Sequence, residues 1–347
     1  MSMNRSMTVG YSCCYVPVEL IMAAGFTPKR LIPRGGCADA DSRIHPNTCG
    51  YVKGLLADAL RGASTDMDAI ILANSCDAVR KLYDLLKAWV EKPAPLFMDM
   101  PKKRDADSIA FFASELRGLA SMLESVTCGS FVTSERLSAA IRRMNDLRSA
   151  WMQLYEALKN HEIAGTDVFA LMQDESALDS SGLKDKIMGL LHARTGKTSS
   201  GNGKKILVTG NILNRPEPIS MIEAAGGSIV GFDTCFGIRH YELFVEEGTQ
   251  DPLYALAARY LLRPQCDRMM GIADRIDYLR KTIETTKADG VIMSKVKFCD
   301  NLTYDVPAFQ ETVAAAGIRC LVLENDYEWT DAEKARTKVE AFLEMLD

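Results

Sequence analysis

Cysteine is the residue whose number and placement in this sequence most directly suggest chemistry. The chain has 10 cysteines among its 347 residues. Thiolates are soft ligands that select iron–sulfur clusters, zinc or Cu(I). A zinc ribbon would show closely spaced CxxC pairs, which this sequence lacks. Widely separated cysteines instead fit a cluster that is assembled between domains.

Six of the cysteines lie in connections between predicted elements, in the order Cys13, Cys49, Cys76, Cys235, Cys266 and Cys299. The first, third, fourth and sixth come within a few residues of the end of a predicted strand, where open parallel sheets place ligand-binding loops. Three fall in each half of the chain, in the same serial arrangement. Burial as a small hydrophobic residue explains any one of them equally well, but six at such positions together favour ligation.

The remaining cysteines are interpreted differently. Cys37, Cys128 and Cys320 are expected to be packing residues, Cys320 especially because it lies in the apolar run CLVLE. Cys14, next to Cys13, fits either interpretation.

Other residue types give weaker signals. The histidines His45, His161, His192 and His240 show no HExxH spacing, so a zinc site of that kind is not predicted. GNILNRPEP (210–218) follows a predicted strand but lacks the glycine patterns of dinucleotide-binding or P-loop sites, so any ATP hydrolysis would belong to a partner.

Two carboxylates are the candidate catalytic residues. Glu19 and Glu324 lie near predicted strand ends, where they would serve as acid–base groups or as helix caps. Arg239 and Lys297 lie close in sequence to Cys235 and Cys299 and would offset the charge of a cluster.

These residues must be positioned by alternating strands and helices. Apolar runs predict strands at 7–11, 28–32, 67–74, 205–209, 228–232, 290–294 and 320–324, separated by segments of helical periodicity. Such alternation implies an α/β fold, with two doubly wound, flavodoxin- or Rossmann-like parallel-sheet domains. We expect an N-terminal α/β domain (1–102), a helical insertion and linker (103–198) and a C-terminal α/β domain (199–347). The Gly/Ser/Thr-rich stretch 195–204 marks the last boundary.

Composition narrows the partners and the compartment. The net charge of −5 and the pI near 5.6 argue against nucleic acid. No apolar run is long enough to span a membrane, and the N-terminus lacks the apolar stretch of a secretory signal, so we expect a cytoplasmic protein. Thiols stay reduced in the cytoplasm, so metal binding, catalysis or burial explains the cysteines better than disulfides do.

Serial motifs carry a family resemblance. GYSCCYVPVELIMAAGFTPKRL (10–31), NTCGYVKGLL (47–56), NSCDAVRKLYD (74–84), FDTCFGIRHYE (232–242), KFCDNLTYDVP (297–307) and the tail 321–346 resemble the 2-hydroxyacyl-CoA dehydratase D-component and benzoyl-CoA reductase superfamily. In its dehydratases the resemblance implies a [4Fe–4S] cluster on three cysteines, matching Cys49, Cys76 and Cys299. With Cys13, Cys235 and Cys266 also present, the chain is more similar to the double-cubane cluster proteins, whose [8Fe–9S] cluster takes six thiolates.

The resemblance also implies partners and a reaction. A separate homodimeric, ATP-hydrolysing [4Fe–4S] activator would deliver low-potential electrons for the reduction of small molecules. The oligomer would be a homodimer or a heterodimer with a paralogous subunit. Two alternatives stay open: a [4Fe–4S] subunit of an acyl-CoA dehydratase or reductase, and a non-catalytic cluster scaffold or redox sensor.

Overall fold

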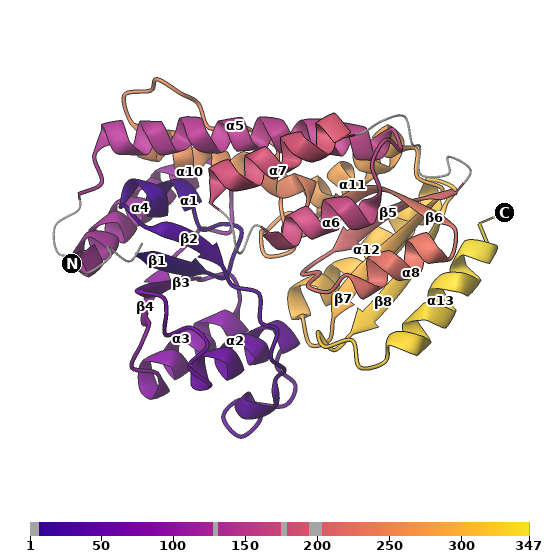
Figure 1. Cartoon of the computed structure of the whole chain (residues 1–347), viewed down its shortest axis with the longest axis horizontal. Coiled ribbons are helices and arrows are strands. Elements are labelled where there is room, and N and C mark those ends of the chain that lie inside the picture. The colour runs from indigo at the N-terminus through magenta and orange to yellow at the C-terminus, as the bar shows by residue number, and fades with distance from the viewer. Residues whose placement is uncertain (1–6, 128–130, 175–178, 194–202, 347) are drawn as a thin grey trace. The chain divides into compact units, whose positions relative to one another are not determined.

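Two all-parallel, four-stranded sheets with flanking helices form the framework of the chain (Figure 1). The computed structural model describes residues 7–127, 131–174, 179–193 and 203–346. The predicted α/β fold with two parallel-sheet domains is therefore confirmed.

Contacts along the backbone divide the chain into two units. The N-terminal unit comprises residues 1–147, 175–181 and 243–263, and the C-terminal unit comprises residues 148–174, 182–242 and 264–347. Each unit gathers separate segments, whereas the predicted domain limits follow the chain in order. Those limits stay a prediction.

The sheet of the N-terminal unit has the strand order β2-β1-β3-β4. Its strands are β1 (Thr8–Tyr11), β2 (Thr27–Arg30), β3 (Ala69–Ala73) and β4 (Ala94–Met98). β3 is a continuous apolar run and is buried along its whole length, as expected of a central parallel strand. The helices of this unit are α1 (Val18–Ala23), α2 (Gly50–Leu60), α3 (Asp77–Trp89), α4 (Ala106–Thr127) and α10 (Pro252–Leu262), with a short 3₁₀ turn η1 (Ala38–Ala40).

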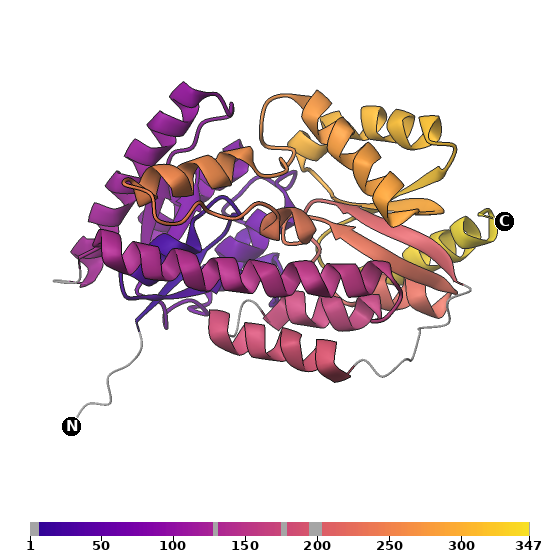
Figure 2. The ribbon, with the colours of Figure 1, turned by 90° about the horizontal axis from the view of Figure 1, so that it is seen from above.

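The sheet of the C-terminal unit has the order β6-β5-β7-β8. Its strands are β5 (Lys204–Gly210), β6 (Gly227–Asp233), β7 (Gly290–Val296) and β8 (Arg319–Asn325). One face packs on α11 (Ile272–Thr286) and α12 (Asp300–Ala315), and the other carries α8 (Glu217–Ala224) and α13 (Ala332–Glu344) (Figure 2). Val291 and Met293 of β7 point into the α11–α12 core because alternate residues of a strand face the same side.

The part of the sequence that lies between β4 and β5 is helical where the structure describes it, as its periodicity predicts. Its helices are α4, α5 (Ser134–Lys159), α6 (Gly165–Asp174) and α7 (Ser180–Ala193). Most of the predicted linker 195–204 lies outside the described residues. Within the described residues, no helix is both long and apolar enough to cross a bilayer.

Candidate metal centre

The nine cysteines that the structure describes are thiols, with no disulfide among them. Cys128 lies outside the described residues. Of the six proposed ligands, Cys76 is half-buried and the other five are buried. Cys37 and Cys320 are half-buried, and the Cys37 thiol donates to the carbonyl of Gly50. The six proposed ligands are thus largely shielded from water, as a cluster environment requires.

Three of the proposed ligands stand at helix N-termini. Cys49 is the N-cap of α2, Cys76 the N-cap of α3 and Cys299 the N-cap of α12. The first turn of a helix presents unsatisfied N–H groups and the positive end of the helix dipole. Both favour a thiolate over a thiol, so these positions suit anionic sulfur ligands.

In the C-terminal unit, the three predicted ligands share charged neighbours. The sulfur of Cys299 lies 3.8 Å from Oδ2 of Asp267, and Arg268 Nη1 lies 3.8 Å from the sulfur of Cys266. Asp267 and Arg268 form an ion pair at 3.5 Å, and both side chains are less than a tenth exposed. The chain of contacts therefore joins Cys266 to Cys299.

Arg239 connects the third cysteine to this group. Burial by itself lowers the pKa of Arg239, but the carboxylates of Asp233 and Asp267, and Cys235 and Cys266 in their thiolate form, raise that pKa above its ordinary value. The buried guanidinium therefore lies near both Cys235 and Cys266. It also pairs with the carboxylate of Asp233, Nε to Oδ1 at 2.7 Å.

Backbone carbonyls fix the guanidinium of Arg239 in place. Its Nη2 donates to the carbonyl oxygens of Gly210 at 2.7 Å and of Asp233 at 2.6 Å, and its Nη1 to that of Gln265 at 3.3 Å. These acceptors come from the ends of β5 and β6 and from the residue before Cys266. One side chain thus holds together the loops that carry Cys235 and Cys266.

Two glycines permit this close approach. Gly210 has φ of 126°, and a Cβ there would come within 2.0 Å of the carbonyl oxygen of Ser294. A Cβ at Gly237, two residues after Cys235, would lie 1.9 Å from the carbonyl oxygen of Phe232. Contacts this short cannot exist, so only glycine fits either position.

The electrostatic balance at Cys299 depends on its neighbours. Burial and the charge of Asp267 raise the pKa of the Cys299 thiol, while Arg268, the N–H of Leu302 and the side chain of Asn211 oppose the rise. A cationic ligand would reverse this balance, since a bound metal deprotonates a coordinating thiol.

In the N-terminal unit, Tyr51 links the segments that carry Cys13 and Cys49. Its hydroxyl donates to the carbonyls of Ser12 at 2.8 Å and Leu31 at 3.1 Å, and Tyr51 lies in the first turn of α2. The segment leading to Cys76 is fixed separately by Lys102. The ammonium of Lys102 donates to the carbonyls of Asn74 and Ser75.

Cys14, for which the sequence allows two interpretations, contacts a buried cation. Nη2 of Arg263 lies 3.0 Å from its sulfur and 3.3 Å from its carbonyl oxygen. The guanidinium carbon of Arg263 also lies 4.3 Å from the ring centroid of Tyr15. Cys14 therefore has a partner that explains its burial without a metal.

The two candidate carboxylates lie in different surroundings. Glu19 in α1 is fully buried and accepts a hydrogen bond from the Tyr260 hydroxyl at 2.8 Å. Glu324 on β8 is about half exposed, is paired with Lys295 and lines a small pocket together with Lys297. The two carboxylates belong to different units.

Sequence reasoning missed Arg263, Asp267 and Arg268. The one available signal was RPQCDR (263–268), where two arginines and an aspartate flank Cys266. The contact between Arg263 and Cys14 spans 249 positions of the chain, so no local pattern could reveal it.

The candidate ligands are all thiols, the donors that iron–sulfur clusters use. No three His, Cys, Asp or Glu side chains of the described residues are grouped tightly enough to hold one ion. In an iron–sulfur cluster each protein thiolate binds its own iron, so the ligands stand farther apart. Reduced, shielded thiols with cationic and N–H neighbours are the surroundings that such a cluster uses.

Comparison with known proteins finds relatives that are named as acyl-CoA dehydratase and reductase subunits. The model of the family "2-hydroxyglutaryl-CoA dehydratase, D-component" matches residues 13–346. The beta subunit of (R)-phenyllactyl-CoA dehydratase from Clostridium sporogenes is 24% identical over 100% of this chain and 93% of its own length. The beta subunit of lactoyl-CoA dehydratase from Anaerotignum propionicum is 24% identical (97% and 91%), and a benzoyl-CoA reductase subunit from Thauera aromatica is 25% identical (86% and 80%).

Proposed function

The chain belongs to the 2-hydroxyglutaryl-CoA dehydratase D-component family, and from this premise we propose that it is a subunit of an iron–sulfur reductase that reduces small molecules at a double-cubane [8Fe–9S] cluster. The ligands are the thiolates of Cys13, Cys49, Cys76, Cys235, Cys266 and Cys299. The proposal rests mainly on one observation, the grouping of three of these cysteines around Arg239, Asp267 and Arg268.

That grouping favours six ligands over three. A subunit of the dehydratase type would use only Cys299 of the three cysteines in the C-terminal unit. Cys235 and Cys266 would then be ordinary packing residues beside a buried arginine that already pairs with Asp233. As thiolates they would add two anionic neighbours to the positive charge of Arg239.

When bound, the cluster supplies low-potential electron transfer. The protein sets the surroundings in which this happens. Arg239 and Arg268 place positive charge beside the thiolates, which favours the more negative, reduced state. The N-termini of α2, α3 and α12 place the positive end of a helix dipole at Cys49, Cys76 and Cys299 and act in the same direction.

Reduction also requires protons, and we assign their supply to Glu19 before Glu324. Glu19 is buried and hydrogen-bonded to Tyr260, a second proton-carrying group, whereas Glu324 is half-exposed and paired with Lys295. A shielded carboxyl–phenol pair can hold a proton that bulk water does not exchange at once.

The partners follow from the same proposal. Electrons come from a homodimeric [4Fe–4S] activator that hydrolyses ATP. Two of the relatives are named as beta subunits, which supports assembly with a paralogous subunit as an alternative to a homodimer. We expect the protein to act in the cytoplasm.

Two other functions make different predictions. A [4Fe–4S] subunit of a 2-hydroxyacyl-CoA dehydratase or benzoyl-CoA reductase is favoured by the names of the relatives and would use Cys49, Cys76 and Cys299 alone. A non-catalytic cluster scaffold or redox sensor would bind iron without turnover.

Iron and sulfide analysis of anaerobically purified protein tests the proposal. We expect a brown sample that air bleaches, with about eight irons per chain against about four for a single cubane. Cys235→Ser and Cys266→Ser should lower that number. About four irons per chain, unaltered in both variants, would contradict the double cubane and support the dehydratase-type subunit. If the protein is fully loaded with iron but shows no turnover with activator and ATP, the non-catalytic scaffold is supported instead.

A further inference from the structure

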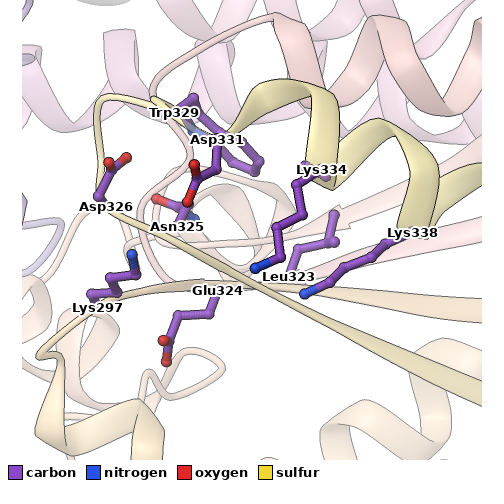
Figure 3. Close-up of a pocket in the computed structure, with 10 residues that line it drawn as sticks. Lys297, Leu323, Glu324, Asn325, Asp326, Trp329, Asp331, Lys334 and Lys338 are labelled. Carbon is purple, nitrogen blue, oxygen red and sulfur yellow. The ribbon is translucent and has the colours of Figure 1, made fainter.

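A small charged pocket lies in the C-terminal unit, beyond the carboxyl ends of β7 and β8. It has a volume of about 140 Å³ and is lined by Lys297, Leu323, Glu324, Asn325, Asp326, Trp329, Asp331, Lys334, Ala335 and Lys338. In Figure 3 Lys334 and Lys338 reach from α13 toward β8, and Lys297 stands on the other side of Asn325. The ends of parallel strands are where open α/β sheets bind ligands.

The lysines of this pocket carry uncompensated charge. Lys297, Lys334 and Lys338 form no ion pair with any residue in the described ranges. Lys334 and Lys338 are four residues apart, on one face of α13, where like charges repel each other. An anion between them would remove this repulsion.

Two of the carboxylates that line the pocket already have partners. Glu324 pairs with Lys295, outside the lining. Asp326 accepts hydrogen bonds from the backbone N–H and the hydroxyl of Thr330, which lower the pKa of its carboxyl against the effect of burial. The neutral donors of Thr330 leave the negative charge of Asp326 in place, and Asp331 at the start of α13 is the third carboxylate of the lining. The three lysines therefore face two carboxylates that have no other cationic partner, which leaves the lining with an excess of positive charge.

Trp329 supplies an independent sign of a missing ligand. Its side chain is 7% exposed, and its buried indole N–H meets no acceptor in the part of the chain that the structure describes. A buried donor without a partner is costly and calls for a bound water, ion or ligand. The backbone of Trp329 also has a positive φ of 57°, and strain of this kind gathers at binding sites.

Size and charge restrict the ligand. Pockets for drug-sized molecules hold roughly 300–1,000 Å³, so this one takes a fragment. Lysine is a common point-charge partner of phosphate, and the positive N-terminus of α13 borders the pocket. We propose that this pocket binds a phosphate group, either as a free anion or as the phosphate end of a larger ligand that extends into solvent. Lys297 lies two residues before Cys299, but none of the six proposed ligands lines the pocket, and the phosphate proposal does not depend on the function proposed for them.

Calorimetric titration of the full chain, purified anaerobically, tests this site with pyrophosphate, coenzyme A and ATP as probes. The double variant Lys334→Gln/Lys338→Gln should bind at least about tenfold more weakly, since each lost charged hydrogen bond is worth a factor of that order. Arg336→Gln is the matched control. It removes a positive charge from the same helix, but Arg336 pairs with Glu333 and does not line the pocket.

Tryptophan fluorescence locates the binding event. The chain has 3 tryptophans, and only Trp329 lines the pocket. A ligand-induced change in emission should therefore disappear in Trp329→Phe. Pantetheine, the part of coenzyme A that lacks phosphates, should not bind.

The three probes distinguish the sources of the phosphate. Tightest binding of coenzyme A indicates a thioester substrate, tightest binding of ATP a nucleotide, and binding of pyrophosphate alone a small anion. No binding at millimolar probe, or equal affinity in the double variant and in Arg336→Gln, overturns the proposal. Neither result bears on iron content, so the cluster proposal would stand or fall separately.

Discussion

A nitrogen of Arg263 lies 3.0 Å from the sulfur of Cys14, and both residues are almost completely buried. Arg263 follows the last turn of α10, while Cys14 lies in the turn after β1. Tyr15 offers its ring to the same guanidinium. One cation therefore fixes the turn that also carries Cys13.

Replacing Arg263 should destabilise the protein strongly. Arg263→Gln removes the cation–ring contact and the contacts with Cys14, and it leaves their partners buried. We expect the free energy of unfolding to fall by about 3 kcal/mol, measured by urea denaturation of the metal-free chain. Arg280→Gln, at an exposed pair with Asp277, is the control and should change stability by less than about 0.5 kcal/mol. Similar values for the two variants would contradict the role of Arg263.

Cys13 and Cys14 should differ in their effect on iron content. Cys14 has Arg263 as its partner, so Cys14→Ser should retain most of the iron, whereas Cys13→Ser should lose a ligand. Metal analysis of both variants after anaerobic purification gives the comparison. If Cys14→Ser removes the iron and Cys13→Ser does not, Cys14 rather than Cys13 is the iron ligand in this turn.

Cys299 and Cys320 should separate metal binding from packing. Cys76 is the half-buried N-cap of α3, so Cys76→Ser should reduce cluster occupancy with little loss of fold. Cys299, the N-cap of α12, is also buried in the core between α11 and α12, so Cys299→Ser should reduce cluster occupancy and cost some packing stability as well. Burial raises the pKa of the Cys320 thiol to about 11, which marks an apolar site. Cys320→Ser should therefore lower the thermal midpoint and leave iron content unchanged. If Cys320→Ser lowers the iron content and Cys299→Ser does not, Cys320 is the ligand and Cys299 the packing residue.

His161 should make stability depend on pH. Burial, followed by the charge of Lys205, lowers the pKa of His161 below its ordinary 6.5, and its Nδ1 lies 2.8 Å from the hydroxyl of Ser228. The unfolded chain therefore takes up the proton more readily. The stability that neutral His161 contributes is complete above about pH 6.5 and is lost as the pH falls further.

His161→Asn tests this directly. Asparagine tolerates the positive φ of 59° at this position. The variant should show a flatter decline of the unfolding midpoint between about pH 7 and pH 5 than the parent chain. An unchanged decline would mean that other groups cause it.

The apolar runs predicted most of the framework. Strands β1, β3 and β5 to β8 agree with the predicted strands within a few residues, because buried parallel strands are short and almost wholly apolar. β4 was missed, since APLFM is brief and contains a proline. Helix α12 begins at Asp300 and continues through Pro307, so tertiary packing overrode the tendency of proline to break a helix.

The positions at which the helices begin matter for the candidate site. Helix α12 begins after Cys299 and α3 begins after Cys76, which makes these two cysteines N-caps. Spacing identified the candidate cysteines, but the partners of Cys14, Cys266 and Cys299 come from distant segments or from side-chain directions. These are products of packing, which local patterns do not contain.

Gly210 and Gly237 have a practical consequence for anyone who randomises this gene. Neither glycine has a reactive group, yet even the single methyl group of alanine would force the strand ends apart where Arg239 hydrogen-bonds to them. In a deep mutational scan that measures protein abundance, these two positions should tolerate substitution as poorly as the residues of the buried core. The candidate site thus depends on two residues that have no side chain at all.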